Sequence, residues 1–223
     1  MIKIVVYDSG YGGELFADKL ESELSVADII RVIDWRNANQ INQNAHLARK
    51  CAESALRPYI GNVDLIIFAN HLLTLTSLKH FQRQYKNQKF LGINFDPGTI
   101  SDSLLRPTLI LTTTPVTRTP KYYKLIFKLK CPNITLRLDS WPKLIDDGEL
   151  TKEIIKYDIH NLLARNNFKP ANVILACTHF TDVKAEIKSA LGGKVKTQDG
   201  FNETIRDIYK IIKIRGGLKK QKY

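Results

Sequence analysis

The chain has 223 residues, 43% hydrophobic and 25% charged, which is long enough to bury the core of one large domain or two small lobes. No apolar run approaches the ~18 residues that cross a membrane, and the N-terminal MIKIVVYDSG begins a strand pattern without a signal-peptide segment. Cys51, Cys131 and Cys177 form no CxxC pair, which argues against a disulfide framework and against a zinc site. We therefore expect a cytoplasmic protein that has no metal and does not enter a membrane.

The formal net charge of +12 is concentrated in two places. Residues 208–223 contain six Lys or Arg and no acid, and much of the remaining excess lies in residues 118–130. A solvated basic tail and one basic helix face explain this pattern most simply, so we expect no nucleic-acid partner. A weak polyanion contact, or a general attraction of dianionic substrates, is the functional alternative.

Strand and helix patterns alternate through the first half of the chain. The run VDLIIFAN is almost continuously apolar, which is typical of a strand buried on both faces of a parallel sheet. We expect a loop at GYGG, residues 10–13, and a break in a helical pattern at Arg57, before Pro58. The predicted strands are 3–9, 28–34, 63–70 and 89–96, the last halting at Pro97 and Gly98, and the predicted helices are 14–24, 41–60 and 73–87.

The same alternation then starts again. NVILACT is a second almost continuously apolar strand, and residues 134–145 read as a short strand followed by a loop. The other predicted strands are 108–114 and 194–199, and the predicted helices are 119–130, 148–167, 182–193 and 201–214. This alternation predicts an α/β fold with mostly parallel sheets. We expect a first lobe at 1–97, which the C-terminal helix could complete, a second lobe at 98–205, and a C-terminal helix and basic tail at 206–223.

Polar residues cluster where four of the predicted strands end. Open α/β sheets bind their ligands at the carboxyl ends of the strands, so these clusters predict a site in a cleft between the two lobes. The clusters are Asp8 and Ser9, Asn70 and His71, Thr112 to Thr114, and Cys177, Thr178 and His179.

The order of these motifs resembles the cofactor-independent aspartate/glutamate racemase superfamily, and glutamate racemase most of all. KIVVYDSGYGGELFADKL resembles the strand-DSGxGG-helix opening of that family, and LTTTPVTRT resembles the start of its second lobe. VILACTHF is similar to the GCTHYP segment that bears a catalytic cysteine. The resemblance runs from residue 2 to about 205. It implies two similar lobes around an active-site cleft, an amino-acid racemase activity and a link to peptidoglycan.

In that family two cysteines face each other across the cleft and act on one Cα, without a metal or a cofactor. The resemblance implies that Cys177 is one of this pair, that His179 promotes its ionisation, and that Asp8 holds the substrate ammonium or orients the opposite base. Ser9, Asn70, Thr113 and Thr178 would bind the substrate. The implied partner is a small acidic amino acid or dicarboxylate, and a homodimer is left open.

The sequence departs from the family pattern where the first cysteine should stand. In place of an ACNT segment it reads FANHLLT; counting from Asp64 puts Asn70 at the cysteine position, and a shift by one puts Ala69 there. DWRNANQIN also replaces the Pro-Tyr-Gly loop of the family. Three interpretations follow: His71 is the second acid/base, a single cysteine performs a one-face reaction as in arylmalonate decarboxylase, or the protein binds without catalysis. His71 could also be a helix-start residue satisfied by backbone.

Overall fold

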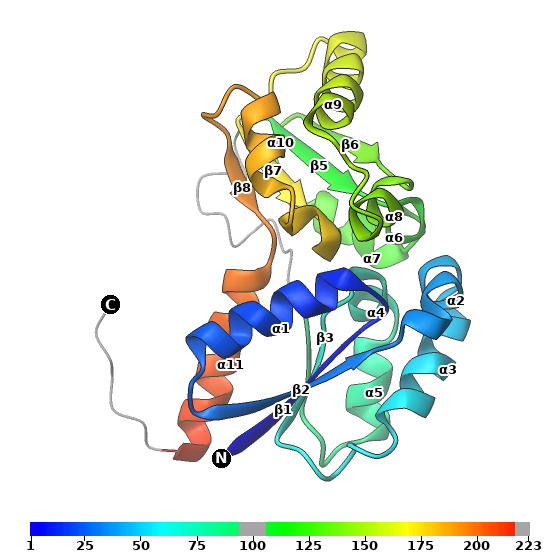
Figure 1. Ribbon diagram of the computed structural model, residues 1–223, viewed down its shortest axis with the longest axis vertical. Coiled ribbons are helices and arrows are strands. Elements are labelled where there is room, and N and C mark those ends of the chain that lie inside the picture. Colours follow the sequence, from blue (N-terminus) through cyan, green and yellow to red (C-terminus); the bar gives the residue numbers. More distant parts are fainter. Residues whose placement is uncertain (94–105, 217–223) are drawn as a thin grey trace.

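The computed structural model describes residues 1–93 and 106–216, and it folds into two lobes stacked along the long axis of the molecule (Figure 1). Each lobe contains a four-stranded sheet in which every pairing is parallel. The strand orders are β2-β1-β3-β4 and β6-β5-β7-β8, so the two lobes repeat one topology. The predicted α/β fold is confirmed. The predicted strand end at Pro97 and Gly98, and the lobe boundary beside it, lie outside the described residues.

The first lobe is built around β1 and β3, its two central strands. All four residues of β3 are buried, as the continuous apolar run predicted. The strands are β1 (Ile2–Asp8), β2 (Ala27–Ile33), β3 (Leu65–Phe68) and β4 (Phe90–Gly92). The helices are α1 (Tyr11–Glu23), the 3-10 turn η1 (Trp35–Asn37), α2 (Ala38–Gln43), α3 (Ala45–Leu56), α4 (His71–Thr76) and α5 (Leu78–Gln84).

The second lobe repeats this plan around β5 and β7, whose residues are all buried. The strands are β5 (Thr108–Thr112), β6 (Asn133–Arg137), β7 (Asn172–Leu175) and β8 (Lys196–Gln198). The helices are α6 (Thr114–Thr117), α7 (Pro120–Ile126), α8 (Trp141–Asp146), α9 (Lys152–Asn166), the 3-10 turn η4 (Thr178–Thr181) and α10 (Lys184–Ala190). Helix α9 ends at Asn166, and its C-cap Asn167 has a left-handed φ of 44°, as the predicted stop at these two residues requires.

The structure corrects four details of the predicted elements. GYGG is not a loop, because α1 begins at Tyr11 and uses Gly10 as its N-cap. The predicted loop within 134–145 contains α8, which begins at Trp141 with Pro142 in its first turn, where proline is favourable. The long helical patterns at 41–60 and 73–87 are each divided, by Asn44 and by Ser77, into two short helices.

The C-terminal helix α11 (Phe201–Gly216) returns to the first lobe. It runs beside β1 and α1 in Figure 1, and its buried face joins their core. The ring of Phe201 meets the ring of Phe16 edge to face, with the centroids 5.0 Å apart. The first lobe therefore packs residues from both ends of the chain.

Two packing contacts among the described elements hold the lobes together. Helix α1 packs on η4, and a separate apolar cluster joins α4 of the first lobe to α7, β5 and β7 of the second. Leu72 and Leu75 supply the first-lobe side of this cluster, and Tyr122 lies on the other side. Across residues 1–93 and 106–216 the structure contains no helix that is long and apolar enough to span a membrane.

Candidate active site between the lobes

A cavity of about 500 Å³ opens between the lobes at the carboxyl ends of the central strands. Its position follows from the parallel sheets, because all four polar clusters leave their strands at this edge. The cavity is lined by seven of the eight predicted site residues: Ser9, Asn70, His71, Thr113, Cys177, Thr178 and His179. The eighth, Asp8, is fully buried.

Cys177 and Asn70 occupy equivalent positions in the two lobes. Each is the second residue after its strand, β7 or β3, and each is the extended N-cap of the helical turn that follows. The alignment that counts from Asp64 therefore agrees with the fold, because it puts Asn70 at the position equivalent to Cys177. Ala69 instead packs into the first-lobe core. Among the described residues that line the cavity, Cys177 is the single cysteine.

His179 connects Cys177 to an acid that the sequence did not reveal. Its Nδ1 lies 3.7 Å from the Cys177 Sγ, and its Nε2 lies 3.3 Å from Oδ1 of Asp146, at the end of α8. Burial alone would lower the pKa of His179, but the contacts with Asp146 and Cys177 and the charge of Asp8 outweigh it and raise the pKa to about 11. The imidazole is therefore protonated at neutral pH, and it places a positive charge beside the sulfur.

Asp8 organises the residues beneath the cavity. Its Oδ1 accepts from the Ser9 backbone N–H at 2.6 Å and from Asn70 Nδ2 at 2.9 Å, and its Oδ2 accepts from the Thr178 hydroxyl at 3.3 Å. Burial raises the pKa of Asp8 to about 6, although the charge of His179 and these hydrogen bonds oppose the rise. Through Thr178 the carboxylate ties the first lobe to the second. Asp8 therefore lies beneath the cavity wall and contacts three residues that line it.

His71 is the first residue of α4 and is 3% exposed. Burial lowers its pKa to about 3, against a smaller opposing effect of Asp199. A general acid or base works best when its pKa lies near the working pH. A ring with a pKa of about 3 is neutral at pH 7, and a neutral imidazole is a weak acid.

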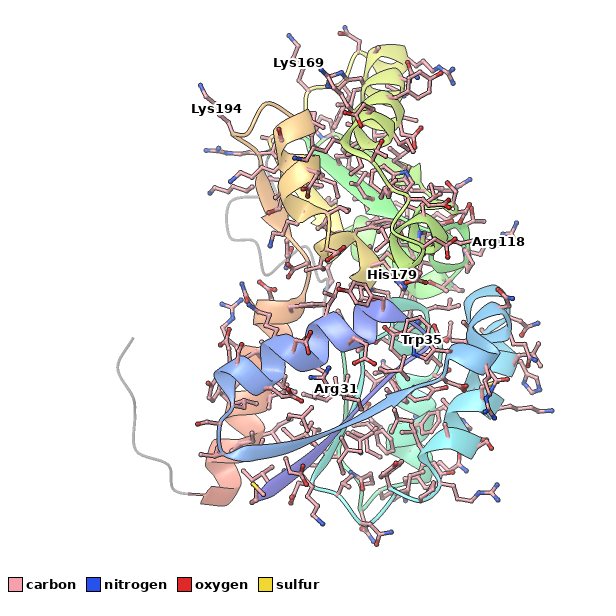
Figure 2. All side chains as sticks on the ribbon, viewed as in Figure 1. Arg31, Trp35, Arg118, Lys169, His179 and Lys194 are labelled. Atoms are coloured by element: carbon pink, nitrogen blue, oxygen red, sulfur yellow. The ribbon has the colours of Figure 1, made fainter. Side chains whose placement is uncertain are left out.

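The glycines of GYGG permit the close approach of α1 to the second lobe. A Cβ on Gly12 would lie 2.1 Å from the Thr178 hydroxyl oxygen, and one on Gly10 would lie 2.9 Å from His179 Nε2. Figure 2 shows His179 at this junction, above Trp35. A Cβ on Gly13 would lie 2.4 Å from the Asp8 Cβ. The motif therefore serves packing around the site, and it lets Asp8 and Thr178 meet.

The second-lobe wall is rich in acids, and each of them has a partner. Asp139 accepts from the Thr114 backbone N–H and hydroxyl at 2.7 and 2.6 Å. Asp147 pairs with Lys143, and Asp146 with His179. Asp139 is therefore engaged by a neutral partner, and Asp146 and Asp147 by cationic ones. On the opposite side Ala38 and Asn39, from the segment that replaces the Pro-Tyr-Gly loop, line the cavity.

No family model matches the chain. A glutamate racemase from Clostridium acetobutylicum is 25% identical over 92% of this chain and 82% of the relative. The structure of glutamate racemase from Francisella tularensis in complex with D-glutamate matches with a TM-score of 0.80 and 20% identity, over 99% of this chain and 84% of that one. Escherichia coli glutamate racemase in complex with L-glutamate and the activator UDP-MurNAc-ala matches with a TM-score of 0.82 and 17% identity, over 95% and 82%.

The chain is glutamate racemase-like in sequence and fold. The predicted resemblance and the predicted two-lobe architecture are confirmed. Asp146, which contacts His179, is among the lining residues that the sequence did not suggest. It lies in WPKLIDD, which reads as a loop, and the signal that could have found it is a carboxylate at the end of the short helix that begins at Trp141.

Proposed function

We propose that the protein is a glutamate racemase-like isomerase that exchanges the α-proton of a small acidic amino acid at Cys177, with altered or reduced inversion because the facing thiol is absent. The similarity to glutamate racemases supports the reaction class. One observation carries the proposal: the cavity places a thiol 3.7 Å from a protonated imidazole on one side, and an amide at the equivalent position on the other.

In the proposed reaction the Cys177 thiolate removes the proton from Cα, and the charge that develops toward the substrate carboxylate is stabilised by His179. The hydroxyl of Thr113 and the amide of Asn39 line the same cavity and can donate to carboxylate oxygens. Asp8 holds Ser9, Asn70 and Thr178 in place. The Cys177 thiol can then exchange its proton with solvent and deliver a solvent-derived proton to the same face of the carbanion, which exchanges the α-hydrogen without inversion.

Inversion requires a proton donor on the other face of the planar intermediate. Asn70 cannot supply one, and burial keeps His71 neutral with its pKa at about 3. The proposal therefore predicts that exchange of the α-hydrogen is faster than inversion. The one-face alternative, a decarboxylase-like enzyme that protonates a carbanion, uses the same thiol and shares this expectation.

The test is incubation with L-glutamate or L-aspartate in deuterated water, with loss of the α-proton signal followed by NMR and configuration followed by chiral chromatography. Exchange that outpaces inversion supports the proposal, and inversion at the same rate as exchange would show that a second acid is present. Cys177→Ser should abolish exchange, whereas Cys51→Ser, on α3 away from the cavity, should retain it. If the folded protein exchanges neither amino acid, the catalytic proposal fails and a binding role replaces it.

A further inference from the structure

The positive charge of the chain is not spread evenly along it. Residues 65–93 and 106–138 contain eleven Lys and Arg and no Asp or Glu. The whole chain has 34 Lys and Arg and 22 Asp and Glu, so the other residues hold 23 cations against 22 anions and nearly balance. The net charge of +12 is therefore almost entirely a property of these two segments, and the basic tail is offset elsewhere.

The fold brings the two segments together at the lobe junction. The first contains α4 and α5, the second contains α6 and α7, and α4 packs on both α6 and α7. Lys79 and Arg83 are exposed on α5, and Lys121 and Lys124 lie on α7. We call these four residues the junction cations. Within residues 1–93 and 106–216 none of the four makes an ion pair with an acid.

Three of the junction cations, Lys121, Lys79 and Arg83, are close enough for their charges to interact. Partial burial lowers the pKa of Lys121, and the charges of Lys79 and Arg83, which come from the other lobe, lower it further. Like charges that face each other across a lobe junction are unfavourable unless an anion lies between or over them. An extended polyanion matches this arrangement better than a single small anion, because the cations span two helices in two lobes.

Two exposed aromatic residues neighbour Lys124, Tyr123 within α7 and Phe127 directly after it. Tyr123 is 51% exposed and Phe127 is 85% exposed, and their spacing of four residues places them on one side of this turn. The apolar side of α7, with Tyr122 at its centre, is already packed into the cluster that joins the lobes. This leaves α7 little apolar surface to insert into a bilayer, whereas two aromatic rings among lysines suit stacked bases.

We propose that the α5–α7 surface binds single-stranded nucleic acid, with the junction cations on the phosphates and with Tyr123 and Phe127 stacked on bases. This surface is distinct from the cavity between the lobes, and the inference does not depend on the proposed function. It revises the expectation of no nucleic-acid partner, which rested on the charge of the tail and of one helix face.

Binding is tested with a fluorescently labelled 20-nucleotide single-stranded oligonucleotide, followed by anisotropy with the full chain. Four phosphate contacts give a slope of about −3 for log K against log salt, so affinity should fall roughly 50-fold between 50 and 200 mM salt. Replacing all four junction cations by Gln should reduce affinity at 50 mM salt by at least tenfold. Tyr123→Ala with Phe127→Ala should also reduce it about tenfold, at unchanged charge.

The matched control replaces four other cations, Lys152, Lys156, Lys169 and Lys188 of the α9 and α10 region, by Gln. It has the same net charge as the junction variant and should bind within about threefold of the unmodified chain. The proposal would be overturned if the two quadruple variants lost equal affinity for the oligonucleotide. It would also be overturned if deleting residues 217–223 abolished binding. If the unmodified chain does not bind the oligonucleotide, the proposal is wrong. Binding to phosphatidylserine vesicles without binding to the oligonucleotide would likewise contradict it. Circular dichroism and thermal melting establish that each variant is folded.

Discussion

At the scale of single residues, the site contains two buried groups whose pKa values are both raised. The pKa of His179 is about 11 in the folded protein, against an ordinary value of 6.5. Its protonation therefore stabilises the folded protein fully below pH 6.5, and this contribution is lost as the pH rises through 11. The pKa of Asp8 is about 6 in the folded protein, against an ordinary value of 3.8, so folding favours its protonated form. The stability that this protonation contributes is full below pH 3.8 and is lost as the pH rises through 6. At neutral pH Asp8 is ionised, and its burial in that charged form lowers the stability of the folded protein.

Asp8→Asn should remove this cost. The amide can still accept from the Ser9 N–H and Asn70 through its oxygen, and it can donate to Thr178 through its nitrogen. The difference between 3.8 and about 6 corresponds to about 3 kcal/mol, so the variant should gain up to about that much in free energy of unfolding relative to the unmodified chain. Urea denaturation should show the gain growing between pH 4 and 6.5 and then levelling. A difference independent of pH would contradict the assigned titration.

Asn70→Cys should restore the facing thiol. The new sulfur would stand at the position equivalent to Cys177, so the ratio of inversion to α-proton exchange should rise. The change also removes a cap, since Asn70 Oδ1 accepts from the Leu73 N–H at 3.0 Å, and we expect a loss of about 1 kcal/mol in stability. Asn70→Ser is the matched control, because it keeps a capping oxygen without a thiol. If the cysteine and serine variants invert glutamate equally slowly, the two-thiol geometry is not available in this cavity.

At the scale of elements, the approach of α1 to η4 sets the shape of the site. Gly12→Ala would place a methyl group 2.1 Å from the Thr178 hydroxyl, so the two elements must move apart. We expect a loss of about 1–3 kcal/mol in stability and a loss of activity larger than that of any substitution outside the site. Ser22→Ala, in the exposed last turn of the same helix, is the control and should change little. Activity retained in Gly12→Ala would show that the lobes can separate here without harm.

The sequence predicted elements well where local pattern and burial agree. β3 and β7 were predicted because both faces of each strand are covered, which makes the apolar run continuous. The breaks at Asn44 and Ser77 were missed because the hydrophobic period continues across them. At Asn44 the break is a local cap, since its side chain accepts from the backbone N–H groups of His46 and Leu47. Asp146 was missed for a different reason: its meeting with His179 depends on how α8 packs on η4, which no local pattern records.

At the scale of the whole molecule, the second lobe lies in the sequence between two segments of the first, because the C-terminal helix α11 packs on the first lobe. α11 adds Phe201, Ile205, Ile208 and Ile212 to a core whose other members lie in the first lobe. The first lobe should therefore depend on residues that follow the second lobe in the sequence, and its strand β1 should not be stable without them. This matters for function because the carboxyl end of β1 carries Asp8 and Ser9.

Phe201→Ala tests this dependence. Phe201 is 1% exposed and packs edge to face on Phe16, so its truncation leaves a cavity in the first-lobe core, and we expect a loss of about 3–5 kcal/mol in the free energy of unfolding. Tyr157→Ala, at a 70% exposed aromatic on α9, should lose far less. Hydrogen exchange then locates the effect: amides of β1 and β3 should lose protection first, while those of β5 and β7 keep it longer. Equal loss of protection in both sheets would instead mean that the two lobes unfold as one cooperative unit, joined through α4 and α7.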